Sequence, residues 1–87
     1  MRTIRTARDL GIAIRRARHD RKWSQTELAR RAAVSRQWLS EVETGKRTVE
    51  LGRVLTLLDA LDLALTVTDS PTDSGAVDLD DLLRSST

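Results

Sequence analysis

The sequence predicts an all-α fold of four to five helices with one strand near its C-terminal end. Helix start and stop signals follow one another closely between residues 24 and 47, and apolar residues recur at helical spacing on both sides of that stretch. Apolar and polar residues then alternate at 63–68, which is typical of a half-buried strand. We expect residues 1–69 to form one small domain and residues 70–87 to form an acidic, disordered tail.

The first helix is expected at residues 6–18. Thr6 is a suitable N-cap, and Asp9 lies three residues later, as in a capping box. Gly11 weakens this helix by about 1 kcal/mol relative to alanine, so we expect close packing at that position. One face is apolar and would be buried: Leu10, Ala13, Ile14 and Ala17.

The second helix begins after Ser24, which forms a capping box with Glu27. Trp23 and Leu28 occupy the two positions of a hydrophobic staple. The helix ends at a turn over residues 33–34. A left-handed residue other than glycine would cost about 1 kcal/mol in that turn.

The third helix runs from a Ser35 cap to Gly45, which is a suitable stop and is followed by two cations. Leu39 and Val42 lie on its apolar side and must be buried. The remaining residues face outward, and they are Arg36, Gln37, Trp38, Ser40, Glu41 and Thr44.

This outward face suits base edges in the major groove of DNA, because Arg pairs with guanine, Gln pairs with adenine and a carboxylate accepts from cytosine. Trp38 can touch a thymine methyl group, or it can pack back near Trp23. Glu41 can read a base, or it can hold Arg36 or Arg47 in place. We expect base contacts from Arg36, Gln37, Trp38 and Glu41.

A fourth helix is expected over residues 49–61, with Thr48 as its cap. Its apolar residues are too many for one stripe, so we expect two buried faces. One face would pack on the preceding helices and the other on a second copy of the chain. Asp62 falls at the left-handed helix stop, a conformation that Asp tolerates.

The strand at 63–68 needs a partner, and the same strand of a second subunit is the better solution. The alternative is an extended segment that lies on the core of its own chain. A small domain also gains stability from a partner copy. We expect the homodimer interface to include Leu58, Leu61, Leu63, Leu65 and Val67.

Charge divides the chain into two unlike parts. Residues 1–53 carry 14 Lys or Arg and 6 Asp or Glu, a net +8, and residues 54–87 carry 1 and 7, a net −6. A basic N-terminal part matches the electrostatic footprint of a nucleic-acid binder. Charge asymmetry that only aids solubility is the alternative.

Catalysis, a cofactor and a metal site are not expected. The chain has no Cys and a single His, His19, which lies in a polar stretch and is expected to be solvated. No nucleophile and base pair or phosphate-binding glycine loop is apparent. The sequence contains no membrane-length apolar run, so we expect no membrane association and a cytoplasmic location.

The motifs W-S-Q-x-x-L-A, V-S-x-x-x-L-S-x-x-E and G-K-R resemble those of the lambda/Cro repressor-like helix-turn-helix (XRE) family, over residues 10–63. Ala33 departs from the family, which often has Gly at this turn. The resemblance implies a repressor that binds double-stranded DNA at an inverted-repeat operator. It also implies contacts to the DNA backbone from Ser24, Gln25, Ser35, Ser40, Lys46 and Arg47.

The fourth helix runs into D-L-A-L-T-V-T-D and a polar tail, and this order resembles the HipB-type antitoxins. That resemblance implies a homodimer joined by a two-stranded lid, autoregulation of a type II toxin–antitoxin operon, and a HipA-type serine/threonine kinase toxin as partner. A stand-alone phage-type or metabolic repressor and a protein-binding neutraliser that does not bind DNA are the alternatives. Within the tail we expect toxin contacts from Val77, Leu79, Leu82 and Leu83.

Overall fold

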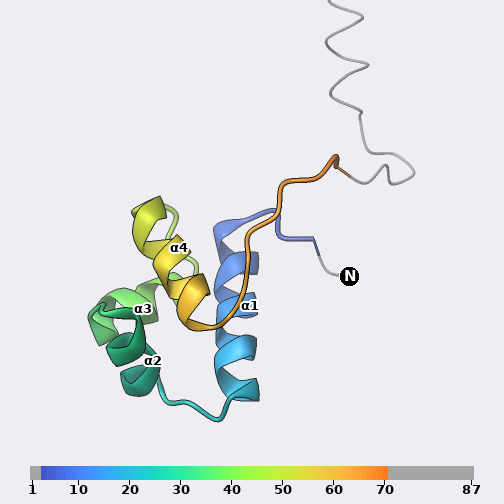
Figure 1. Ribbon diagram of the computed structural model, residues 1–87. Helices are drawn as coiled ribbons and strands as arrows, with labels where there is room; N and C mark the ends of the chain where they lie inside the picture. The colour runs from blue at the N-terminus through green and yellow to red at the C-terminus, as the bar shows by residue number, and fades with distance from the viewer. Residues whose placement is uncertain (1–2, 71–87) are drawn as a thin grey trace, which may run out of the picture.

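The computed structural model describes residues 3–70, which contain four α-helices (Figure 1). They are α1 (Ala7–Asp20), α2 (Gln25–Ala32), α3 (Arg36–Glu43) and α4 (Leu51–Ala60). α1 and α2 both pack against α3, and α2 also packs against α4. Within residues 3–70, no helix is long and apolar enough to cross a membrane. The four predicted toxin-contact residues lie outside the described residues.

The predicted start of α1 is confirmed. The Thr6 hydroxyl accepts a hydrogen bond from the backbone N–H of Asp9 at 3.0 Å, and the Asp9 carboxylate accepts one from the backbone N–H of Thr6 at 3.2 Å. The two bonds close a full capping box. At its other end α1 extends to Asp20, two residues beyond the predicted end at residue 18, and Arg21 is its C-cap.

The predicted starts of α2 and α3 are also confirmed, because Ser24 and Ser35 are their N-caps. Ala33 between the two helices adopts the left-handed conformation, with φ 56° and ψ 42°. The capping box at α2 is only half formed. The Ser24 hydroxyl accepts from the N–H of Glu27 at 3.0 Å, but the Glu27 carboxylate pairs with arginines one turn further along.

The core gathers the apolar faces of all four helices. Trp23, Trp38 and Val49 pack against it from partly buried positions. The largest side chains that it encloses completely are Ile14, Leu28, Leu39, Leu57 and Leu61.

Gly11 marks the closest approach between α1 and α3. A Cβ atom at this position would lie 2.5 Å from the carbonyl oxygen of Val42 and 2.6 Å from that of Glu43. Both neighbours are backbone atoms near the end of α3 and cannot rotate away. The predicted close packing at Gly11 is therefore confirmed, and it sets the distance at which α1 supports α3.

The predicted start of the fourth helix is wrong. α4 begins at Leu51, and its N-cap is Glu50, which makes no capping hydrogen bond with its side chain. Val49 instead packs on the core from the preceding loop, which keeps residues 48–50 out of the helix. At the other end Asp62 has φ 57°, as the sequence predicted.

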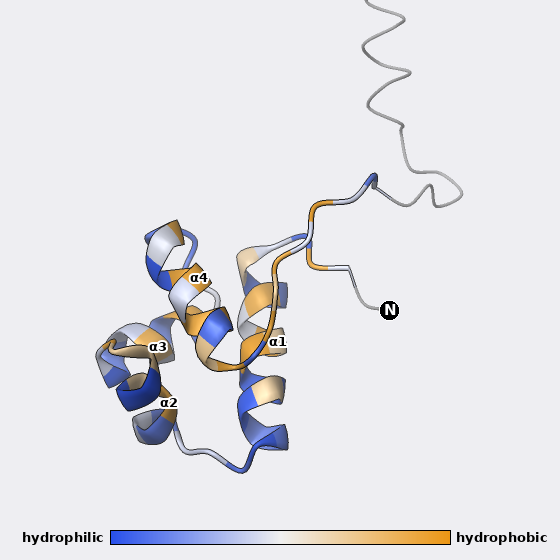
Figure 2. Ribbon diagram, in the orientation of Figure 1, coloured by the Kyte–Doolittle hydropathy of each residue, from blue (hydrophilic) through white to orange (hydrophobic). Residues whose placement is uncertain are grey.

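α4 buries one face within the chain, and Leu51 and Leu55 remain 63% and 43% exposed. No strand is present in the described part of the single chain, including residues 63–70. The alternative of a segment lying on its own core is not what the structure shows, because all of residues 63–70 are exposed. Figure 2 shows hydrophobic residues continuing from α4 into this segment.

Candidate nucleic-acid interface

The outward face of α3 carries the residues expected to read bases. Arg36 and Gln37 are exposed, and Ser40 and Glu41 are half-buried. These four side chains and Gln25 of α2 line one shallow surface cavity. α3 therefore presents a polar ridge, while its opposite side, with Leu39 and Val42, lies in the core.

Trp38 is half-buried and packs against the core, although it belongs to the same helix as the polar ridge. The structure thus supports a packing role for the ring.

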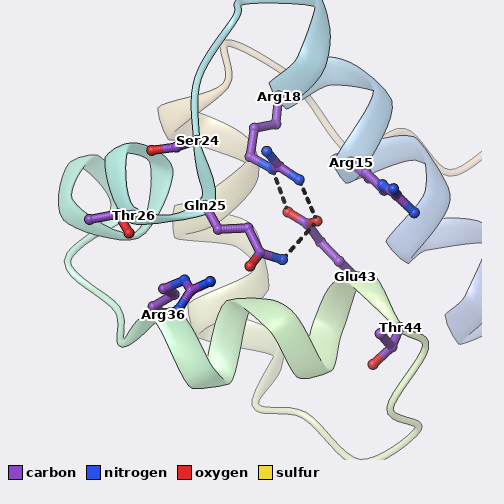
Figure 3. Close-up of a pocket in the computed structure, with 8 residues that line it drawn as sticks. All are labelled: Arg15, Arg18, Ser24, Gln25, Thr26, Arg36, Glu43 and Thr44. Atoms are coloured by element: carbon purple, nitrogen blue, oxygen red, sulfur yellow. Dashed lines mark hydrogen bonds and ion pairs between the residues drawn. The ribbon is translucent and has the colours of Figure 1, made fainter.

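A second cavity, of about 440 Å³, lies where α1, the start of α2 and α3 meet (Figure 3). Arg15 and Arg36 border it from α1 and α3, and Figure 3 shows Gln25 and Thr26 at its edge on the α2 side. The first backbone N–H groups of α2 have no carbonyl partner within the helix. Free N–H groups next to two arginines form a suitable seat for a DNA phosphate.

Ser24 and Ser35 are the N-caps of α2 and α3. Ser24 accepts a hydrogen bond from the N–H of Glu27, and Ser35 accepts one from the N–H of Trp38, each at 3.0 Å. Both side chains therefore accept rather than donate within the chain. Their hydroxyl hydrogens remain available to a phosphate oxygen.

Glu41 holds a cation, but not one of the two expected. Its carboxylate pairs with Lys46 at 3.1 Å, and neither Arg36 nor Arg47 contacts it. Within residues 3–70, Arg36 and Arg47 have no hydrogen-bond or ion-pair partner. Two guanidinium groups are thus free for an acidic ligand, one on α3 and one in the loop that follows.

The arginines of α2, in contrast, are engaged by the protein. Arg30 and Arg31 each donate to the Glu27 carboxylate at 2.9 Å. The hydrogen bond from Arg30 lowers the pKa of Glu27, and the same bond raises the pKa of Arg30. The Arg31 guanidinium also lies 4.2 Å from the centre of the Trp23 ring. Arg30 and Arg31 therefore stabilise α2 and its start, unlike Arg36 and Arg47, which have no such partners in the part of the chain that the structure describes.

A buried ion pair forms the floor of the cavity at α2, and the sequence prediction missed it. Arg18 donates from Nε to Glu43 Oε2 at 2.8 Å and from Nη2 to Oε1 at 2.9 Å. Its Nη1 donates to the carbonyl of Trp23 at 2.9 Å. Gln25 Nε2 completes the cluster by donating to Glu43 Oε1 at 3.3 Å. The pair thereby joins α1, α3 and the start of α2.

A signal for this pair was present in the sequence. Arg18 shares a helix face with Gly11 and Ile14, and Glu43 follows Val42 on the buried side of α3. Opposite charges at core positions of two helices predict a buried ion pair, because an unpaired charge there would be costly.

The residues predicted to form the homodimer interface fall into two groups. Leu58 and Leu61 are 6% and 0% exposed and belong to the core of the single chain, which leaves little of their surface for a partner. Leu63, Leu65 and Val67 are 38%, 53% and 93% exposed. Only the second group offers apolar surface to another molecule.

Comparisons with known proteins bear on this geometry. A family model described as a helix-turn-helix domain matches residues 9–70. An HTH-type transcriptional regulator of Sinorhizobium fredii, y4mF, is 33% identical over 64 residues, which are 74% of this chain and 84% of that protein.

Two solved structures show similar folds. One is titled "Structure of HipA-HipB-O2-O3 complex", and its matched chain has a TM-score of 0.75 and 24% sequence identity, with 82% of this chain and 100% of that chain covered. The other is the restriction-modification controller protein C.AhdI from Aeromonas hydrophila, with a TM-score of 0.62 and 33% identity, covering 67% of this chain and 88% of that one. At 24% identity the first match speaks for the fold alone.

Proposed function

Because the chain belongs to the helix-turn-helix domain family and is similar to a transcriptional regulator, we propose that it is a sequence-specific DNA-binding repressor. One observation carries this proposal. The polar ridge of α3 faces outward beside a cavity that combines a helix start with Arg15 and Arg36. Base edges and a phosphate therefore have adjacent sites on one surface.

In the proposed complex α3 enters the major groove. Arg36, at the first position of the helix, reads a guanine, and Gln37 reads an adenine. The N-terminus of α2 receives a phosphate of the flanking backbone. Ser24, Gln25, Ser35, Ser40, Lys46 and Arg47 are proposed to contact the backbone, and Trp38 and Glu41 to face the bases.

The protein is proposed to act as a symmetric dimer on an inverted repeat, with half-sites about one helical turn apart. Exposed apolar side chains at Leu63, Leu65 and Val67 support this, since the segment has surface to bury. Within that segment the only backbone hydrogen bond to the rest of the chain is donated by the N–H of Leu63 to the carbonyl of Leu58. Pairing with the same segment of a second copy would satisfy the backbone polar groups along one edge of the segment.

The proposed reader, Arg36, is tested by its replacement with alanine. Arg36→Ala should weaken binding to a selected duplex by about 1–3 kcal/mol and relax the preference at one base position. Arg47→Ala is the matched control, because Arg47 is also exposed and unpaired but lies in the loop after α3. It should weaken all duplexes alike and reduce the slope of affinity against salt by about 1. Equal losses of affinity for selected and random DNA would show that Arg36 does not read a base.

The dimer is tested by placing a charge in the exposed segment. Val67→Asp should leave thermal unfolding of the dilute chain unchanged, because the side chain is 93% exposed. It should also increase the dissociation constant of the dimer at least tenfold, since a charge would be buried in the interface. Sedimentation or light scattering over a concentration series gives the dissociation constant, and a thermal melt followed by circular dichroism gives the unfolding transition. Dimerisation as strong as that of the original chain would exclude this segment as the interface.

A HipA-type kinase toxin is proposed as a protein partner, which would make the chain an antitoxin. The likeness in fold to a chain from the HipA-HipB-O2-O3 complex supports this role. The sequence of the tail, with Val77, Leu79, Leu82 and Leu83 among acidic residues, offers apolar side chains that a partner groove could accept. Deletion of residues 72–87 should weaken binding to a kinase that is encoded by a neighbouring gene. Unchanged affinity would exclude the tail as the segment that binds the toxin.

A regulator without a toxin is the second candidate. The similarities to y4mF, which is named a transcriptional regulator, and to the controller protein C.AhdI support it. A kinase-like reading frame next to the gene would favour the antitoxin. A protein-binding neutraliser would fail to shift duplex DNA from its own upstream region in a gel.

A further inference from the structure

Gln25 links the buried ion pair to the surface proposed to meet DNA. Its Nε2 donates to Glu43 Oε1 at 3.3 Å, and its side chain lines both surface cavities. Figure 3 shows the amide nitrogen turned toward Glu43 and the amide oxygen turned away from it. Replacement of Glu43 would therefore remove a hydrogen bond that orients the Gln25 side chain at the start of α2.

The charge of Glu43 determines which way the Gln25 amide faces. An ionised carboxylate only accepts hydrogen bonds, so the amide must present its nitrogen to it. The flipped amide would bring two acceptors together. Glu43 itself cannot turn, because Arg18 binds both of its oxygens and the two side chains are 9% and 3% exposed.

We propose that Glu43, fixed by Arg18, is a positioning residue for DNA binding that acts through Gln25. The amide nitrogen carries two hydrogens, and Glu43 takes one of them. The second is then held ready for a phosphate at the start of α2, beside the free N–H groups of that helix. This role rests on the proposed DNA-binding function. Its advantage is that a flexible side chain is ordered before DNA arrives, which removes part of the entropic cost of binding.

The test replaces the ion pair without leaving a charge behind. Arg18→Met/Glu43→Leu substitutes apolar side chains for the pair, an exchange that buried pairs commonly tolerate without loss of stability. This double variant is combined with Gln25→Ala in a thermodynamic cycle. Affinity is measured for a mixed-sequence duplex at one salt concentration, because a phosphate contact does not depend on sequence. Thermal unfolding of each variant verifies that it folds.

The positioning role predicts a coupled loss. Exchange of the ion pair should weaken DNA binding about fivefold when Gln25 is present, which corresponds to one hydrogen bond. It should cause no further loss in the Gln25→Ala chain. An equal loss in both backgrounds would overturn the proposal, because the pair would then support only the fold. A wild-type chain that binds no duplex would overturn the DNA-binding function together with it.

The free protein provides a readout that does not involve DNA. The two side-chain amide protons of Gln25 should be separated more widely in chemical shift than those of a solvated glutamine, and should exchange more slowly, while Glu43 accepts one of them. In the Arg18→Met/Glu43→Leu chain they should resemble those of a solvated glutamine. Glu50→Ala, which removes an exposed acid at the start of α4, should leave them unchanged. Identical Gln25 signals with and without Glu43 would contradict the proposal that Glu43 orients the Gln25 amide.

Discussion

Glu43→Ala should lower the free energy of unfolding by about 3–5 kcal/mol, because it leaves the Arg18 guanidinium buried without its partner. The side chains of this pair are 9% and 3% exposed, so the Arg18 guanidinium is largely removed from water and depends on the carboxylate. Small domains are stable by only about 5–15 kcal/mol in total. Chemical or thermal denaturation of the variant should therefore show a chain near the limit of folding.

Two controls separate the ion pair from a general loss of acidic residues. Glu50 forms an exposed pair with Arg53 at 3.4 Å, with side chains 70% and 56% exposed. Glu50→Ala should change stability by less than about 1 kcal/mol, as is usual for surface pairs. Arg18→Met/Glu43→Leu should recover most of the stability lost in Glu43→Ala. Full stability of the single variant would show that the pair does not hold α1 on α3.

Gly11→Ala should destabilise the protein by about 1–3 kcal/mol, although alanine favours a helix. The new methyl group would lie 2.5 Å and 2.6 Å from two backbone oxygens of α3, which is closer than such atoms can approach. α1 and α3 would have to separate, and that movement would loosen the packing beneath the proposed reading helix. Denaturation should show the lower stability, and DNA affinity should fall as well.

The matched substitution Gly52→Ala should have the opposite sign. Gly52 lies in the first turn of α4, and an added Cβ would meet only a carboxylate oxygen of Glu50, at 3.8 Å. The variant should gain up to about 1 kcal/mol from the higher helix propensity of alanine. A gain of stability at both glycines would contradict the close approach of α1 and α3.

Local signals explain which parts of the fold were predictable. Thr6, Ser24 and Ser35 were identified as caps because a cap needs only the residue itself and a backbone N–H three positions on. The left-handed conformation of Asp62 was predicted in the same way, from one residue at a helix end. Such interactions are complete within four or five residues.

Tertiary packing explains the misses. The start of α4 depends on where Val49 meets the core, which no local pattern specifies. The surplus of leucines for one face predicts a second buried face on this helix, and the contact of Leu58 and Leu61 with a second copy stays a prediction. The single chain packs these two in its own core and leaves Leu51 and Leu55 exposed. The choice among similar leucines is made by the neighbouring helices.

The candidate interface was predicted in part for the same reasons. The outward ridge of α3 follows from helical periodicity and was expected at Arg36 and Gln37. In the Arg18–Glu43–Gln25 cluster, Glu43 is bonded to residues that lie 25 and 18 positions earlier in the sequence. The Glu41–Lys46 pair depends on the geometry of the loop after α3. Contacts of this kind appear only when the helices are placed in space.

The central claim is that the polar face of α3 reads DNA as part of a symmetric pair of chains. In vitro selection from random duplexes with the full-length protein, at low ionic strength, tests it most directly. The expected product is an inverted repeat whose half-sites lie about one helical turn apart. A pool that remains random after repeated rounds, or a protein that retains no duplex at all, would contradict the claim.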